Sequence, residues 1–530
     1  MAVPLRQAIR EACRRDEAAC VAALLREQAA ATYDRAAVAA QARQLIVAVR
    51  EQRSHASGVD HLMHEFALSS QEGVALMCLA EALLRIPDTE TADRLIRDKL
   101  SHGDWAAHLG GSPSLFVNAA SWGLMITGRL VSTHSESVLG GALTRLLVRG
   151  GEPLIRHGMD YAMRLLGQQF VMGETIDAAL ARAAESEVRG YAFSFDMLGE
   201  AALTTADAER YCAAYTQAIH AIGVASDGRG IVGGPGISVK LSALHPRYVR
   251  SQRERVMTEL RARLKGLMLL ARRYEIGFNI DAEETDRLEL SLDLFESLAS
   301  DAELAGWHGM GFVVQAYQKR CPAVVDYLID LARRTHRRFM LRLVKGAYWD
   351  SEIKRAQVDG LTDYPVYTRK VHSDLAYLVC AERMLAAPDA IYPQFATHNA
   401  HTLGSVVQMA RARGINDYEF QCLHGMGEPL YDNVVAAGRP GGRVRIYAPV
   451  GTHETLLPYL VRRLLENGAN SSFVNRIVDE KVSIDELVTD PVEIVRATGG
   501  ARHVRTYALR VRFRPDLQMW CFGDFCRKRP

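Results

Sequence analysis

Residues 311–346 read GFVVQAYQKRCPAVVDYLIDLARRTHRRFMLRLVKG, the most informative pattern in the chain. The two ends, 311–317 and 339–346, are short apolar runs typical of buried strands. Between them, residues 321–337 show the spacing of an amphipathic helix, and Pro322 is well placed to open it. The stretch therefore predicts a strand, a helix and a second strand, the repeating unit of a parallel sheet.

The same unit recurs through the second half of the chain. Further helical stretches are predicted at 251–275, 401–413 and 453–467. Eight alternating strand and helix units in about 300 residues predict a (β/α)8 barrel of the TIM type. The eight apolar runs are YAFSFDML (191–198), GISVKLS (236–242), GFNIDAEE (277–284), GFVVQAY (311–317), FMLRLVKG (339–346), PQFATHN (393–399), YEFQCLHG (418–425) and RVRIYAPVG (443–451).

A doubly wound sheet is the alternative architecture. It usually has fewer strands, and a dinucleotide-binding form carries GxGxxG after its first strand. The GGPG at 233–236 precedes a predicted strand and is interpreted as a turn. One local conflict remains in the barrel prediction: Pro458 lies inside the last predicted helix, which therefore begins near Thr455 or bends at the proline.

The first 170 residues have almost entirely helical signals. Ser69 and Glu72 form a capping-box pattern, and Pro87 marks a helix stop. This part of the chain is predicted to be a helical scaffold, without the basic helix or ribbon that is typical of a DNA-binding module.

Composition narrows the functional classes. The 530 residues include 64 basic and 62 acidic side chains, so no strong net charge favours nucleic acid or an anionic membrane. Nine scattered cysteines without a CxxC pair argue against a disulfide framework or structural zinc and favour a reducing cytoplasm. No signal peptide or run of about 18 apolar residues is evident, and peripheral membrane contact stays open.

Polar side chains gather where the predicted strands end. Active sites of TIM-type barrels are assembled there from several strands. Any one of these residues, taken alone, fits a solvated loop position; together they predict a site. They are Lys240, Asp281, Glu283, Glu284, Gln315, Arg342, Lys345, His398, Gln421 and Tyr447.

A metal-dependent barrel hydrolase is the rival enzyme class. His398 and His401, with Asp281 and Glu283, have the side chains of a metal site. However, the neighbouring arginines and lysines would repel a divalent cation. The sequence therefore predicts no metal.

Residues 458–468, PYLVRRLLENG, suit a small carboxylate instead. Tyr459, Arg462, Arg463 and Glu466 recur at spacings of three and four, so they share one helical face. Arginine offers paired donors to a carboxylate, and Glu466 can hold one guanidinium in place. A solvated charged face is the alternative for this segment alone. With aromatic groups at Tyr348, Trp349, Tyr447 and Tyr459, a cationic site fits a phosphate-bearing aromatic cofactor and a small anionic substrate, as in a flavin enzyme.

The motifs at these positions resemble the proline dehydrogenase region of the proline utilization A family, which are bacterial bifunctional flavoenzymes. The resemblance extends from about residue 5 to 500. The motifs that carry it are EGVALMCLAEALLRIPD, SFDMLGEAA, ISVKLSALHPRY, FNIDAEE, QAYQKR, RLVKGAYWD, FATHNAHT, RIYAPVGTHETLL and YLVRRLLENGAN.

The resemblance implies a distorted barrel that binds FAD and oxidises L-proline to 1-pyrroline-5-carboxylate. Electrons would pass on to a membrane quinone, with transient membrane contact and a homodimer or higher oligomer. The implied divisions are a helical dimerisation arm at 1–50, an α domain at 51–171, the barrel at 172–495 and an unmatched arginine-rich tail at 496–530.

The resemblance also implies roles for individual residues. Asp281 would orient Tyr447, and Glu200 would pair with Arg462 as a gate over the substrate. The substrate carboxylate would be held by Lys240, Arg462 and Arg463, and its ring would pack on Leu343, Tyr348, Tyr447 and Tyr459. Arg342 would lie near the reactive nitrogen of the flavin, and the other expected FAD neighbours are Gln315, Lys345, Gly346, Trp349, Thr368, His398, Gln421, Leu423 and Glu466.

Two departures from the longer members of the family are expected. The chain is predicted to lack their DNA-binding domain, and hence to have no nucleic-acid partner. The resemblance fades near residue 503, so the aldehyde dehydrogenase activity that converts the pyrroline to glutamate is expected to be absent. An inactive truncated scaffold is the remaining alternative, although the predicted catalytic positions keep the residue types that the chemistry needs.

Overall fold

The computed structural model describes residues 5–53, 170–436, 443–452, 459, 462, 473–479 and 481–503. The predicted α domain, the capping box at Ser69, the conflict at Pro458 and most of the tail lie outside the described residues. So does the helix predicted at 453–467, except that Tyr459 and Arg462 are helical.

Eight parallel strands form a closed barrel in chain order, which confirms the predicted (β/α)8 fold. Each predicted apolar run overlaps one strand, although β4 begins one residue and β6 two residues before the predicted runs. Most strand residues are buried, as expected for a parallel sheet that helices cover. The strands are β1 (Tyr191–Met197), β2 (Gly236–Val239), β3 (Phe278–Ile280), β4 (Met310–Gln315), β5 (Phe339–Val344), β6 (Ile391–Ala396), β7 (Glu419–Leu423) and β8 (Arg443–Val450).

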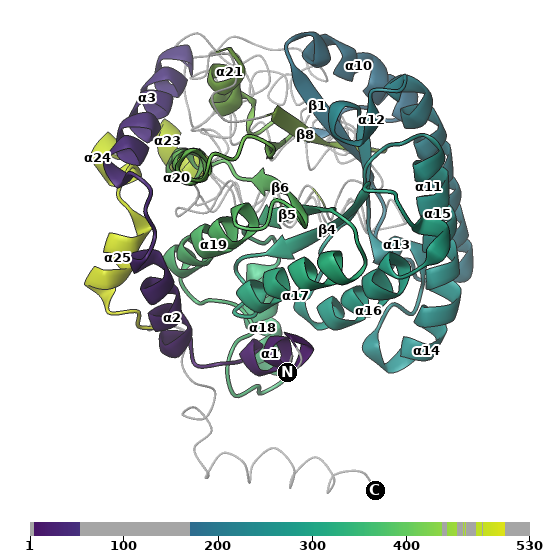
Figure 1. Ribbon diagram of the computed structural model, residues 1–530, viewed down its shortest axis with the longest axis horizontal. Helices are drawn as coiled ribbons and strands as arrows, with labels where there is room; N and C mark the ends of the chain where they lie inside the picture. The colour runs from purple at the N-terminus through teal and green to yellow at the C-terminus, as the bar shows by residue number, and fades with distance from the viewer. Residues whose placement is uncertain are drawn as a thin grey trace, which may run out of the picture.

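Helices surround the strands (Figure 1). Local sequence signals set several helix ends: Thr204 and Asp207 form a capping box, Pro322 lies in a first turn, and Gly414 ends a helix at a φ of 65°. The main helices of this layer are α10 (Ile176–Val188), α11 (Thr205–Ser226), α15 (Arg261–Arg273), α16 (Leu288–Ala299), α17 (Cys321–Arg334), α18 (Trp349–Val358), α19 (Lys370–Leu385), α20 (Ala400–Arg413) and α21 (Glu428–Ala436).

The helix predicted at 251–275 is less regular than expected. It begins as a 3-10 turn at Arg250–Gln252, continues through α14 (Arg253–Arg255) and contains a π-helical segment at Val256–Leu260 before α15. Val256 and Leu260 are both buried, so the π segment keeps two apolar side chains on the core.

Three N-terminal helices wrap the outside of the barrel. As Figure 1 shows in purple, α1 (Leu5–Ala12) packs on α17, α2 (Glu17–Ala29) on α19, and α3 (Arg35–Arg53) on α20. The same side is completed by α23 (Phe473–Val478), α24 (Ile484–Leu487) and α25 (Pro491–Thr498). The segments that precede and follow the barrel in sequence therefore pack on the same side of it.

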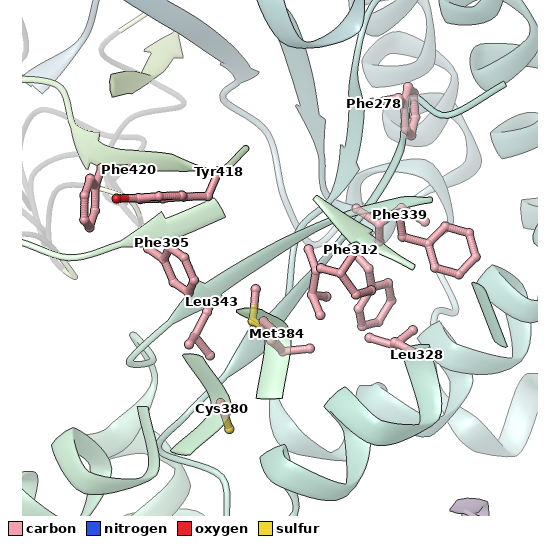
Figure 2. Close-up of a cluster of buried hydrophobic side chains, with 14 of the residues drawn as sticks. Phe278, Phe312, Leu328, Phe339, Leu343, Cys380, Met384, Phe395, Tyr418 and Phe420 are labelled. Carbon is pink, nitrogen blue, oxygen red and sulfur yellow. The ribbon is translucent and has the colours of Figure 1, made fainter. Parts of the chain in front are cut away.

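The core lies mainly between the strands and the helical layer. Figure 2 shows part of it, where Phe312, Phe339, Leu343 and Phe395 from the strands lie among side chains that include Met384 of α19. Within the described part of the chain, no helix has the length and apolar character needed to cross a membrane.

Candidate active site

A buried ion pair joins the ends of the first two strands. Lys240 directly follows β2, and its Nζ lies 2.5 Å from Oδ2 of Asp196 in β1. The side chains are 7% and 0% exposed. Burial alone would lower the pKa of Lys240, but the attraction of Asp196, Asp281 and Glu200 raises it. Burial also raises the pKa of Asp196, partly offset by Lys240.

A second buried group lies beside this pair. Asp281 directly follows β3; its Oδ1 accepts a hydrogen bond from Arg342 of β5 at 2.7 Å, and its Oδ2 accepts one from the Tyr447 hydroxyl at 2.6 Å. Lys240 connects its ion pair with Asp196 to the Asp281 cluster. Its Nζ is 3.4 Å from the Tyr447 oxygen and 3.9 Å from Oδ2 of Asp281. Burial, and then the nearby Asp196 and Asp281, raise the pKa of Tyr447 well above its ordinary value, so this hydroxyl keeps its proton.

Two serines fix Arg342 inside the barrel. Its Nη2 donates to Ser238 at 2.9 Å and to Ser194 at 3.3 Å, and its guanidinium carbon lies 5.2 Å from the centre of the Tyr447 ring. The Nε of Arg342 is buried and has no hydrogen-bond partner. A guanidinium that is fixed but not fully satisfied is suited to a further acceptor in this site.

The expected pair between Glu200 and Arg462 is present. Both guanidinium Nη atoms lie 2.6 Å from the two carboxylate oxygens, and the arginine also lies over the Tyr348 ring. Burial would raise the pKa of Glu200, but the hydrogen bonds and charge of Arg462 lower it overall. The next residue, Ala201, has a left-handed φ of 51°, and its N–H donates to Ser242 at 3.0 Å. This strained turn presents Glu200 to the arginine.

The expected cofactor neighbours after β5 have defined positions. Gly346 has a φ of 130°, and a Cβ there would lie 2.4 Å from the Tyr317 ring. Lys345 pairs with Asp374, and the indole nitrogen of Trp349 donates to the Tyr367 carbonyl at 2.8 Å.

Expected cofactor neighbours on other strands are also held by hydrogen bonds. Gln315 donates to the Glu283 carbonyl at 3.2 Å. His398 accepts the N–H of Leu423 at 3.0 Å. Gln421 donates at 2.7 Å to Glu419, a carboxylate that Arg445 also pairs at 2.8 Å inside the barrel.

Leu343 is not brought to the polar cluster. Successive strand residues point to opposite sides, so Leu343 faces away from the barrel interior that Arg342 occupies. It is fully buried beside Phe395 and Met384 in the apolar layer (Figure 2). Tyr459 is buried. Of the three other residues predicted on its helical face, Arg462 is described above, and Arg463 and Glu466 lie outside the described residues.

Asp196 was missed as a site residue, although a signal existed. It is the acidic residue in SFDML, near the carboxyl end of the first apolar run. The rule applied to the other strands, that polar residues at this end form the site, selects it equally.

The metal hydrolase gains no support from the geometry. Among the residues that the structure describes, no group of three or more His, Cys, Asp or Glu side chains is arranged to hold a metal ion. His398 instead bonds the backbone of Leu423, and burial lowers the pKa of His401.

Three family models match successive parts of the chain. They are described as the Proline utilization A proline dehydrogenase N-terminal domain (residues 4–50), the DNA-binding domain of Proline dehydrogenase (58–170) and Proline dehydrogenase (179–476). The second match corrects the expectation that the chain lacks the family's DNA-binding domain. That expectation rested on where the resemblance to the longer members begins and on the absence of a basic helix or ribbon signature. The matched segment lies almost wholly outside the described residues.

Characterised relatives are similar over nearly the whole chain. The Bifunctional protein PutA of Escherichia coli (strain K12) is 64% identical over 501 residues, covering 92% of this chain and 38% of the relative. The protein of the same name from Rhizobium meliloti is 60% identical over 504 residues, covering 94% and 41%. The chain thus spans less than half the length of these relatives.

A solved structure agrees. A variant of Proline Utilization A from Bradyrhizobium japonicum matches with a TM-score of 0.73 and 46% identity, covering 95% of this chain and 50% of that one. The eight-stranded barrel, the polar cluster at its strand ends and these matches together show that the chain belongs to the proline dehydrogenase family.

Proposed function

We propose that this chain oxidises L-proline to 1-pyrroline-5-carboxylate with FAD as its cofactor. The observation that carries the proposal is the buried cluster of Lys240, Asp196, Asp281, Arg342 and Tyr447 at the carboxyl ends of the barrel strands. Proline has an anionic carboxylate, a ring of five atoms and a basic nitrogen. The cluster, together with Glu200 and Arg462, offers cationic groups to the carboxylate and aromatic faces to the ring.

The residues present fit FAD. The buried N–H at Nε of Arg342 has no acceptor among the described groups and can donate to the cofactor. Lys345 and Arg342 add cationic donors there, each held by a carboxylate, Asp374 for Lys345 and Asp281 for Arg342. FAD, when bound, supplies the acceptor for the hydride that leaves the ring carbon beside the proline nitrogen. Arg342, Gln315, Lys345, Gly346, Trp349, Thr368, His398, Gln421, Leu423 and Glu466 are the residues proposed to hold it.

Binding of the substrate carboxylate is assigned to Lys240, Arg462 and Arg463. A carboxylate removed from water needs paired donors, which two arginines provide. Tyr447 and Tyr459, with Tyr348, would cover the ring, and the hydrogen bond from Tyr447 to Asp281 holds the first of these in orientation. A fixed carboxylate places the carbon that loses hydride in one position.

The pair between Glu200 and Arg462 would serve as the gate. Each guanidinium can pair fully with one carboxylate at a time, so the substrate carboxylate competes with Glu200 for Arg462. Entry of proline therefore requires this pair to open or rearrange.

The remaining parts of the proposal concern partners. Three predictions come from the resemblance: a membrane quinone as final electron acceptor, transient peripheral contact with the membrane, and a homodimer or higher oligomer. A cytoplasmic location is predicted from the scattered cysteines. Membership of the proline dehydrogenase family supports the proposed quinone acceptor and oligomer.

Anaerobic titration of the purified protein with L-proline tests the function. Oxidised FAD should give a visible absorbance band in the wild type, and proline should bleach it. Lys240→Met and Arg463→Met should each need at least about tenfold more proline, because each loses a charged donor to the carboxylate. Lys265→Met is the matched control, because Lys265 lies on the outer helix α15, away from the proposed site. There it pairs with Asp301 and Glu303. A protein without flavin, or one whose flavin proline does not bleach, would refute the proposal.

A further inference from the structure

A carboxylate from the N-terminal helices is buried against the barrel. Glu17 is the first residue of α2 and is 1% exposed. Its two oxygens accept the backbone N–H of Thr368 at 3.0 and 3.1 Å, and one of them lies 2.6 Å from Nδ1 of the buried His372. Burial raises the pKa of Glu17, but these hydrogen bonds outweigh burial and lower it, so the carboxylate is ionised at neutral pH.

Apolar packing brings Glu17 to this place. Val21 and Leu24 of α2 lie in one buried cluster with Tyr367 and with Leu375 of α19. The exposed Glu27 of the same helix differs, because it pairs with Arg383 at the surface. Isolating a carboxylate from water is costly unless it is fully hydrogen-bonded, so the contacts of Glu17 are specific.

Glu17 holds the segment 366–369, which contains one proposed FAD neighbour, Thr368, and is hydrogen-bonded to another, Trp349. The Tyr367 carbonyl accepts the indole N–H of Trp349 at 2.8 Å, and Thr368 follows directly. On its other side, the Thr368 hydroxyl oxygen accepts the backbone N–H of His503 at 2.9 Å. The segment is therefore hydrogen-bonded on one side to helix α2, which precedes the barrel in sequence, and on the other to His503, which follows it.

We infer that Glu17 is a positioning residue of the FAD site, acting through the 366–369 segment to hold Thr368 and Trp349 in the geometry that binds the cofactor. The inference rests on the proposed function, because it assigns those two residues to FAD. It gives the N-terminal helices, which pack on the helical layer outside the barrel, a role in the cofactor site.

Two consequences follow from this arrangement. Loss of the Glu17 carboxylate leaves the Thr368 N–H and His372 without their acceptor, so the apoprotein should bind FAD less tightly. Because coupling between two sites is reciprocal, FAD should in turn tighten the docking of α2. A role in folding alone predicts neither effect.

The test compares FAD binding by the full-length apoproteins of wild type, Glu17→Ala, Glu17→Gln and the control Glu27→Ala. Glu17→Ala should raise the dissociation constant for FAD at least about tenfold, the loss expected for a hydrogen bond to a charged group. Glu17→Gln keeps one carbonyl oxygen for Thr368 and should lose less. Glu27→Ala should bind like the wild type. Thermal unfolding of each apoprotein reports any general loss of stability separately.

Amide hydrogen exchange on the wild type gives a second measurement that needs no variant. FAD should slow exchange at the Thr368 N–H and in α2. Unchanged affinity in both Glu17 variants, an equal loss in Glu27→Ala, or exchange in α2 that ignores FAD would overturn the inference while the proposed function stands. Failure of the wild type to bind FAD would overturn both.

Discussion

Separating the charges of Lys240 and Asp196 should be strongly destabilising, while removing both should cost little more than removing one. The two side chains are almost fully buried, and the ammonium lies 2.5 Å from the carboxylate. At an effective dielectric constant of about 20, Coulomb attraction at this distance is about 7 kcal/mol. Desolvation of the two ions offsets most of this value.

The single substitutions Asp196→Asn and Lys240→Met each leave one buried charge with weakened compensation. Breaking a buried pair in this way costs about 3 to 5 kcal/mol, and the lower end applies here because Asp281 lies 3.9 Å from Lys240 and asparagine keeps an acceptor oxygen. The double variant has no buried charge left from the pair. We therefore expect a coupling energy of about 2 to 3 kcal/mol in the double-mutant cycle.

The pH dependence of the two single variants should differ. In Lys240→Met, Asp196 loses the cation that opposes the effect of burial, so its folded pKa rises further above the unfolded value of about 3.9. A carboxyl with a raised folded pKa favours the folded state when protonated, so stability falls as pH rises from about 4 through the folded pKa. The cost of Lys240→Met should therefore be smaller at pH 5 than at pH 8, whereas Asp196→Asn lacks this titration.

Guanidinium unfolding of the four proteins at both pH values measures these quantities. Of the five tryptophans in the chain, Trp307 is 1% exposed and packs in the core, so its contribution to the fluorescence change reports on unfolding of the barrel. Strictly additive costs of the two substitutions, or a Lys240→Met cost that does not change with pH, would refute the assignment of a coupled buried ion pair.

Three further predictions concern the gate and the site walls. Glu200→Gln should lower the free energy of unfolding at neutral pH by the contribution of the Glu200–Arg462 ion pair. Because the folded pKa of Glu200 is lowered, that contribution is complete above about pH 4.5 and is lost as pH falls through the folded value, so denaturation curves of variant and wild type should converge in acid. Tyr447→Phe removes the donor to Asp281 and should lower kcat/KM for proline about tenfold or more in a dye-reduction assay, with flavin content unchanged. Gly346→Ala should lower Tm and flavin retention, since its φ of 130° and the ring 2.4 Å from the added Cβ both oppose a side chain; normal retention would contradict the tight approach.

The barrel was predictable because parallel strands carry their own signal. Each of the eight strands overlaps a predicted apolar run, and the helices at 321–334 and 400–413 follow from ordinary periodicity and from Pro322. The π-helical segment at Val256–Leu260 was not predicted, because one extra residue per turn leaves the apolar spacing on either side almost unchanged.

The site was predictable as far as topology alone can place side chains. The carboxyl ends of parallel strands share one end of a barrel, so the meeting of Lys240, Asp281, Arg342 and Tyr447 follows from the strand assignment. Strand alternation, applied strictly to FMLRLV, also separates Leu343 from Arg342, a step that transfer of roles by resemblance omitted.

Contacts between residues far apart in the sequence could not be predicted from local patterns. Glu17 and Thr368 are 351 positions apart, and neither segment has a pattern that announces the other. Glu17 itself looks like an ordinary acidic residue in the first turn of a helix, where the helix dipole already favours it.

The charge balance of the described cluster bears on the proposed role of Glu200 and Arg462 in substrate binding. Inside the barrel, Lys240 and Arg342 are matched by Asp196 and Asp281, so this group offers no net positive charge to an incoming carboxylate. The added charge must come from arginines nearer the entrance, and Arg462 is the one whose contacts are described, held by Glu200. A substrate carboxylate that takes the place of Glu200 preserves the balance without a new buried ion. If Arg462 binds the substrate carboxylate as proposed, the gate would therefore select for an anionic group at the same step in which it admits the substrate.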